Sequence, residues 1–167
     1  MRSYEPKNVA STKVIDENIK DEHVEDEGNN IKVKNIVKKD YLGIIEIPKI
    51  GLKRYLYDTT SAMNDVDKNI EIIDGSSMPN IYKGNFILAA HNGNTSVGYF
   101  RNLHKLSLGD EVIINYNDVD YVYEIAKKYD VLKTGKVAIK RDKTRTSITL
   151  ITCFGSDRQL VVIGYLK

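Results

Sequence analysis

Cys153 is the only cysteine among the 167 residues of this chain. It ends the apolar, β-branched run "TLITC" (Thr149–Cys153), and Arg158 follows five residues later. A free thiol is mostly un-ionised at neutral pH, but a nearby cation stabilises the thiolate, which is the nucleophile. An arginine can also donate hydrogen bonds to an oxyanion. This spacing therefore indicates nucleophilic chemistry at Cys153 with Arg158 as its cation.

The flanking sequences predict a hairpin that brings these two residues together. Ser147–Thr152 and Gln159–Leu166 are strand-like, and the residues between Cys153 and Arg158 are typical of a four-residue hairpin loop. Residues opposite each other in such a hairpin share one face, with Cβ atoms about 5 Å apart. We therefore predict that the thiol and the guanidinium point the same way at the rim of a sheet.

Acyl transfer by a cysteine also needs a proton carrier, which is usually a histidine. His23 lies in an acidic stretch, and His104 lies on the polar side of a predicted helix around Phe100–Leu106. His91 instead ends the apolar run "NFILAAH", directly before the turn signal Asn92-Gly93. His91 is therefore the histidine that we predict at a sheet rim.

The elements that must position these residues occupy only part of the chain. Residues 1–39 run from the acidic "DENIKDEHVEDEGNN" to the basic "IKVKNIVKK" and contain one aromatic residue. Such a segment buries too little apolar surface to offset its ordering entropy, which predicts a charged, flexible tail or stalk. Residues 40–167 hold about eight short strand patterns without βαβ alternation. They predict a mainly β domain, an antiparallel or mixed barrel with a few short helices.

Composition excludes several other classes of protein. A net charge of +2 gives no reason to expect a nucleic-acid partner. One cysteine excludes an intramolecular disulfide and a multi-cysteine zinc site. No apolar run approaches the ~18 residues of a membrane span. We expect a cytosolic chain or a soluble part of a longer protein.

Taken together, these motifs resemble the sortase family of Gram-positive bacteria. "TLITC" matches the family's TLxTC signature, and Arg158 begins the next strand, where sortases carry an arginine. "AAHNG" (Ala89–Gly93), "YFRNLHKLSLGDEVII" and "LGIIEIPKIGL" also resemble sortase segments, in the same order. The resemblance covers roughly Tyr41 to Lys167 and implies a closed eight-stranded β-barrel with two or three short helices.

The resemblance also implies a reaction, a cysteine transpeptidation. Cys153 would attack the Thr–Gly bond of an LPXTG-like sorting signal, and His91 would protonate the departing glycine amine. Arg158 would hold the substrate backbone and the oxyanion. An amine, typically on a peptidoglycan precursor, would then resolve the thioacyl intermediate.

Further expectations concern binding and location. Thr152, Ala90 and Asn92 flank the catalytic residues and are expected to contact substrate, although Thr152 could equally serve strand packing. Some sortases use calcium, but Glu71 and Asp74 are the only acids between residues 70 and 91, so we expect no metal or other cofactor. We expect a monomer on the outer face of a Gram-positive cell membrane, with the membrane anchor absent from this chain.

The same residues are compatible with three alternatives to a sortase. A lone cysteine often behaves as a small buried hydrophobe, and a single arginine as a surface charge. Papain-like peptidases and cell-wall amidases place their cysteine on a helix N-terminus and before the histidine, whereas here His91 precedes Cys153. A barrel that binds a surface ligand without catalysis is the third alternative.

Overall fold

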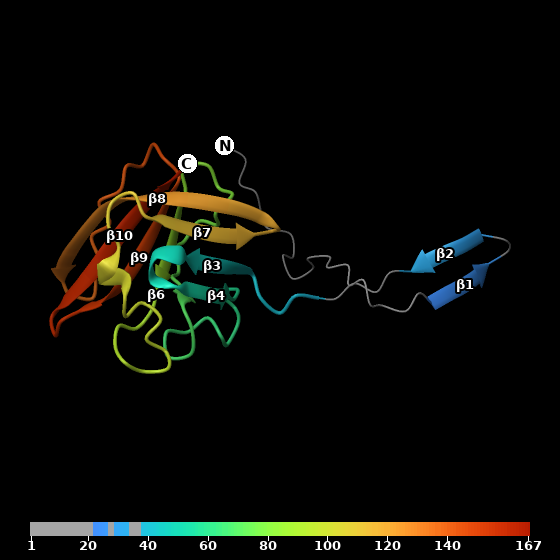
Figure 1. Ribbon diagram of the computed structural model, residues 1–167, viewed down its shortest axis with the longest axis horizontal. Helices are drawn as coiled ribbons and strands as arrows, with labels where there is room; N and C mark the ends of the chain where they lie inside the picture. Colours follow the sequence, from blue (N-terminus) through green and yellow to red (C-terminus); the bar gives the residue numbers. More distant parts are fainter. Residues whose placement is uncertain (1–21, 27–28, 34–37) are drawn as a thin grey trace.

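The computed structural model describes residues 22–26, 29–33 and 38–167. Its main body is one eight-stranded sheet that curls into a nearly closed barrel (Figure 1), with the strand order β4-β3-β7-β8-β10-β9-β6-β5. The mainly β, eight-stranded barrel predicted from the sequence is thus confirmed. The strands are β3 (Gly43–Ile47), β4 (Leu52–Leu56), β5 (Glu71–Ile72), β6 (Asn85–Ala89), β7 (Glu111–Tyr116), β8 (Val119–Leu132), β9 (Ser147–Phe154) and β10 (Arg158–Leu166).

The helices are limited to two short 3₁₀ turns in the described part of the chain, η1 (Pro48–Ile50) and η2 (Leu103–Lys105). The apolar spacing of Phe100, Leu103 and Leu106 predicts a helix, and all three side chains are fully buried. Their backbone, however, forms i→i+3 bonds, Leu103 N to Phe100 O and Leu106 N to Leu103 O. Three residues per turn align the same three side chains, so one tight turn satisfies this apolar pattern.

The strands that carry the candidate residues are buried on both faces. Leu150 and Leu160 point into the barrel and belong to its main core. On the outer face, Val161 and Ile163 pack beneath the segment 133–146, against Val137 among others. This segment therefore acts as a second layer over β8 and β10, and the end of β9 lies next to it.

A buried asparagine links the two edge strands, β4 and β5. The side chain of Asn69 is fully buried just before β5. Its Oδ1 accepts a hydrogen bond from Arg54 Nε (2.7 Å), and its Nδ2 donates to the carbonyl of Tyr55 (2.8 Å). The edge strands β4 and β5 do not pair with each other. The side-chain amide of Asn69 connects them instead, through its two hydrogen bonds to β4.

The segment expected to be a tail contains a hairpin that the sequence did not predict. Strands β1 (Glu22–Asp26) and β2 (Asn29–Val33) pair antiparallel as a separate two-stranded sheet. The assignment of residues 1–39 as a stalk stays a prediction. Among the described residues, no helix is long and apolar enough to cross a membrane.

Candidate active site

The parallel pairing of β6 with β9 brings His91 to Cys153. The register runs from Asn85 opposite Ser147 to Ala89 opposite Ile151. Continuing it by two residues places His91 beside Cys153. Two hydrogen bonds agree with this extension of the register. Ala90 N donates to Ile151 O (3.3 Å), and Asn92 Nδ2 donates to Cys153 O (2.8 Å). Residues two apart in a strand share a face, so this continuation predicts the imidazole and the thiol on the same face as Ala89 and Ile151.

Thr152 and Ala90 support the site from inside the barrel. The exposed fraction is 3% for Thr152 and 5% for Ala90, and Thr152 Oγ1 donates to the Ala90 carbonyl at 2.7 Å. Both side chains are buried here, and their contact with substrate stays a prediction. Their hydrogen bond joins the ends of β6 and β9, immediately before His91 and Cys153.

The loop after His91 is also tightly held. Phe100 N donates to the His91 carbonyl at 3.1 Å, and Phe100 is itself fully buried. A Cβ at Gly98 would lie 2.0 Å from the carbonyl oxygen of Gly93, so the backbone approaches itself here at a distance that only glycine permits. The exposed Asn92 side chain bridges to the Cys153 backbone, which leaves its part in substrate binding a prediction.

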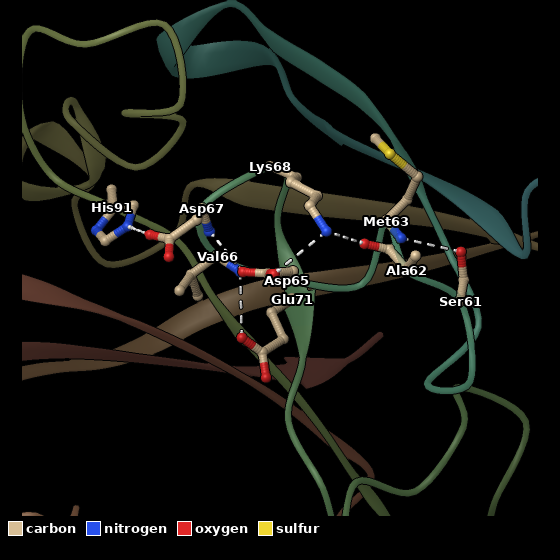
Figure 2. Close-up of polar contacts among 9 residues, drawn as sticks. All are labelled: Ser61, Ala62, Met63, Asp65, Val66, Asp67, Lys68, Glu71 and His91. Carbon is tan, nitrogen blue, oxygen red and sulfur yellow. Dashed lines mark hydrogen bonds and ion pairs between the residues drawn. The ribbon is translucent and has the colours of Figure 1, made fainter.

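Asp67 is a site residue that the sequence analysis missed. His91 Nε2 donates to Asp67 Oδ1 at 2.7 Å (Figure 2). The loop that carries Asp67 is held by its own polar groups: Asp67 N donates to Asp65 Oδ1 at 2.9 Å, and Val66 N donates to Glu71 Oε2 at 3.2 Å. The Asp-x-Asp spacing indicates such a turn, but nothing in it predicts contact with a histidine 24 residues away.

The predicted pairing of Cys153 with Arg158 is wrong. In the structure Cys153 lies opposite Gln159, and Arg158 lies opposite Phe154. Gly155 takes a φ of +68°, and the chain reverses directly after Phe154, through three residues instead of four. This one-residue shift turns Arg158 to the other face of the strand.

The guanidinium of Arg158 has a carboxylate partner on that other face. Arg158 Nε forms an ion pair with Asp130 Oδ2, from the end of β8. Asp130 lies opposite Leu160, whose side chain belongs to the barrel core. The pair therefore sits at the open end of the barrel, whereas Cys153 faces outward.

Residues other than Arg158 surround the outward-facing thiol of Cys153. Gln159 takes the position directly opposite the thiol. Lys133, directly after β8, donates from Nζ to Cys153 Sγ at 3.8 Å. No sequence pattern points to Lys133, because its approach depends on how β8 and β10 are aligned.

The remaining candidates lie elsewhere. His104 is exposed in η2 and uses its carbonyl to accept a hydrogen bond from Lys128. Glu71 is engaged with Val66 N, and Asp74 Oδ1 accepts from Gly75 N. Within the described ranges, no group of three or more metal-ligating side chains comes together. Cys153 lies in a strand, which excludes the alternative of a nucleophile on a helix N-terminus.

The comparison with known proteins decides the family. The sequence model of the sortase domain matches residues 45–167. The chain belongs to the sortase family. Sortase A of Bacillus anthracis is 27% identical to this sortase over 132 residues, which are 77% of this chain. The chain spans only 61% of the length of that relative.

Solved sortase structures share the barrel. Sortase C1 of Streptococcus agalactiae is 30% identical, with a TM-score of 0.66 over 80% of this chain and 70% of that one. A Clostridium perfringens sortase C, solved with the C-terminal cell wall sorting motif, is 28% identical. Its TM-score is 0.66 over 77% of this sortase and 71% of that chain.

Proposed function

We propose that this chain is a cysteine transpeptidase that cleaves an LPXTG-like sorting signal between Thr and Gly. The observation that supports the proposal is the β6–β9 register, which ends at Ala89 opposite Ile151, two residues before His91 and Cys153. Family membership and the sortase C solved with a sorting motif support the substrate class. The accepting group would be an amine of a peptidoglycan precursor, which puts the reaction at the outer face of a Gram-positive membrane.

The chemistry follows from the two side chains. The Cys153 thiolate attacks the Thr carbonyl carbon, and the Thr–Gly C–N bond breaks as the thioester forms. Because Nε2 of His91 is held by Asp67, Nδ1 is the ring nitrogen available to give its proton to the glycine amine. The incoming amine then attacks the thioester and expels the thiolate, and its proton returns to His91.

Arg158 has a smaller catalytic role in this proposal than the family resemblance implies. Its guanidinium is paired with Asp130 on the face away from the thiol. We propose that Arg158 binds the backbone of the substrate at the open end of the barrel, after exchanging Asp130 for a substrate carbonyl. The ion pair is about 40% exposed on both sides, so this exchange costs little.

Trapping the thioacyl intermediate tests the function. The full chain is incubated with an LPXTG-like peptide and analysed by mass spectrometry, with and without an added glycine peptide. We expect an adduct on Cys153 that lacks the glycine portion of the substrate, and transfer to the added amine. Cys153→Ala should keep its melting temperature and lose turnover; residual turnover within tenfold of wild type would contradict the proposal.

We also propose that turnover needs no calcium, because the carboxylates of Glu71 and Asp74 are engaged with backbone N–H groups. Initial rates with the same peptide should agree in excess EDTA and in millimolar calcium. A rise of more than threefold on adding calcium would show that a cation organises the site.

A further inference from the structure

Lys133 is the charged neighbour of the reactive sulfur. Its Nζ lies 3.8 Å from Cys153 Sγ, and among the residues that the structure describes it supplies the one cationic hydrogen bond to that atom. A cation at this distance stabilises negative charge on sulfur. The spacing of Cys153 and Arg158 in the sequence predicts an arginine in this electrostatic role, so a lysine at the sulfur was not expected.

The backbone fixes Lys133 in this place. Lys133 N donates to the carbonyl of Asp157 at 2.8 Å. That bond ties the end of β8 to the turn that follows Cys153, so the ammonium and the thiol start from two backbones joined to each other. Val131, Gln159 and Cys153 are register partners across β8, β10 and β9. Lys133 follows Val131 by two residues and therefore continues on the outward face.

Arg158 cannot stabilise negative charge on the Cys153 sulfur from its position. Its strand neighbour Gln159, not Arg158 itself, lies opposite Cys153. Adjacent residues of a strand point to opposite faces, and the Arg158 guanidinium is paired with Asp130. The cation at the sulfur and the arginine of the family motif are thus two different residues in this chain.

We propose that Lys133 is a catalytic residue that stabilises the Cys153 thiolate, while Arg158 is left for substrate. The catalytic role of Lys133 rests on the transpeptidase function proposed above. Lys133 keeps its own proton throughout the reaction. It stabilises the charge on Sγ before the attack on the Thr carbonyl, and again when the incoming amine expels the sulfur from the thioester.

Alkylation of the thiol tests this without any peptide substrate. Because the chain has one cysteine, the second-order rate with iodoacetamide, an uncharged reagent, reports on Cys153 alone. At pH 7 and low salt we expect Lys133→Met to lower this rate about fivefold, the factor expected for a unit charge about 4 Å away in water. Lys133→Arg should retain most of the rate, and added salt should slow the wild type.

The controls separate charge at the sulfur from charge in general. Lys136→Met removes another exposed lysine of the same segment and should leave alkylation unchanged. A Lys133→Met rate within twofold of wild type, in a variant with unchanged circular dichroism, would overturn the proposal. So would a fall in alkylation with Arg158→Met that Lys133→Met does not share. If no sorting peptide were turned over, the transpeptidase proposal would fail while the alkylation rates still decided the role of Lys133.

Discussion

His91 Nε2 and Asp67 Oδ1 are 2.7 Å apart, although their loops are 24 residues apart in the chain. The carboxylate is 79% exposed and the imidazole 41% exposed, so the pair contributes little to folding. Its effect is geometric, because it holds the ring of the proposed proton donor in one orientation.

Asp67→Asn should therefore lower activity more than stability. We expect kcat to fall by up to about fivefold, equivalent to the ~1 kcal/mol of an exposed ion pair, with KM unchanged. Asp67→Glu should recover part of kcat, and the unfolding free energy should stay within about 0.5 kcal/mol. Steady-state kinetics and urea titration measure both, with Asp74→Asn as a surface-carboxylate control. An unchanged kcat would show that His91 needs no partner.

Replacing each histidine in turn tests the choice of proton donor. His91→Ala should lower kcat/KM by the ~10²–10⁴ typical of a general acid. His104→Ala should change it by less than twofold, because His104 is an exposed residue of η2. Cleavage of the same sorting peptide provides the comparison, and a loss confined to the His104 variant would mean that the wrong histidine has been assigned.

The side-chain amide of Asn69 is expected to stabilise the barrel at its seam, the place where the edge strands β4 and β5 approach each other. Asn69→Leu leaves Arg54 Nε and the Tyr55 carbonyl without the partners they have now. Both hydrogen bonds are part-buried, and one such bond contributes about 0.5–1.5 kcal/mol net, so we expect a loss of about 1–2 kcal/mol in urea unfolding. Asn80→Leu, at an exposed position, is the control; equal stability of the two variants would show that these hydrogen bonds do not stabilise the seam.

We expect that replacing Tyr123 raises the free energy of unfolding and changes how that free energy depends on pH. Its side chain is fully buried, and within the described residues its hydroxyl has no hydrogen-bond partner. Tyr123→Phe should therefore stabilise the barrel by about 1 kcal/mol. Chemical denaturation at pH 8 measures this, with the exposed Tyr82→Phe as control, and a loss above 1 kcal/mol would reveal a hidden partner.

The pH dependence has a definite sign. Burial, and to a smaller extent Tyr121, raises the pKa of Tyr123 above its ordinary value of 10.0. Above about pH 10 the unfolded chain loses this proton while the folded chain keeps it, so the unfolding free energy falls as pH rises further. Below pH 10 this group causes no change. The Tyr123→Phe variant should show a shallower decline between pH 10 and 11 than wild type.

The sequence predicted what depends on local patterns and missed what depends on loop geometry. Alternating apolar residues marked the strands, and the two residues between β7 and β8, Asn117 and Asp118, take the positive φ of a tight hairpin turn. The placement of Cys153 against Arg158 depended on one residue of loop length, where Gly155 shifted the register. Asp67 and Lys133 reach the site from loops 24 and 20 residues away from their partners, and no periodicity encodes such contacts.

The parallel pairing of β6 with β9 also has a consequence for how the protein becomes active. Asn85 and Thr149, which hydrogen-bond across this pair, are 64 residues apart, so the pair is a long-range contact of the kind that slows folding. The thiol and the imidazole meet only when this step is complete. A chain in which this pair has not yet closed therefore carries its single cysteine without its histidine, so the proposed acyl transfer has to wait for this step of folding.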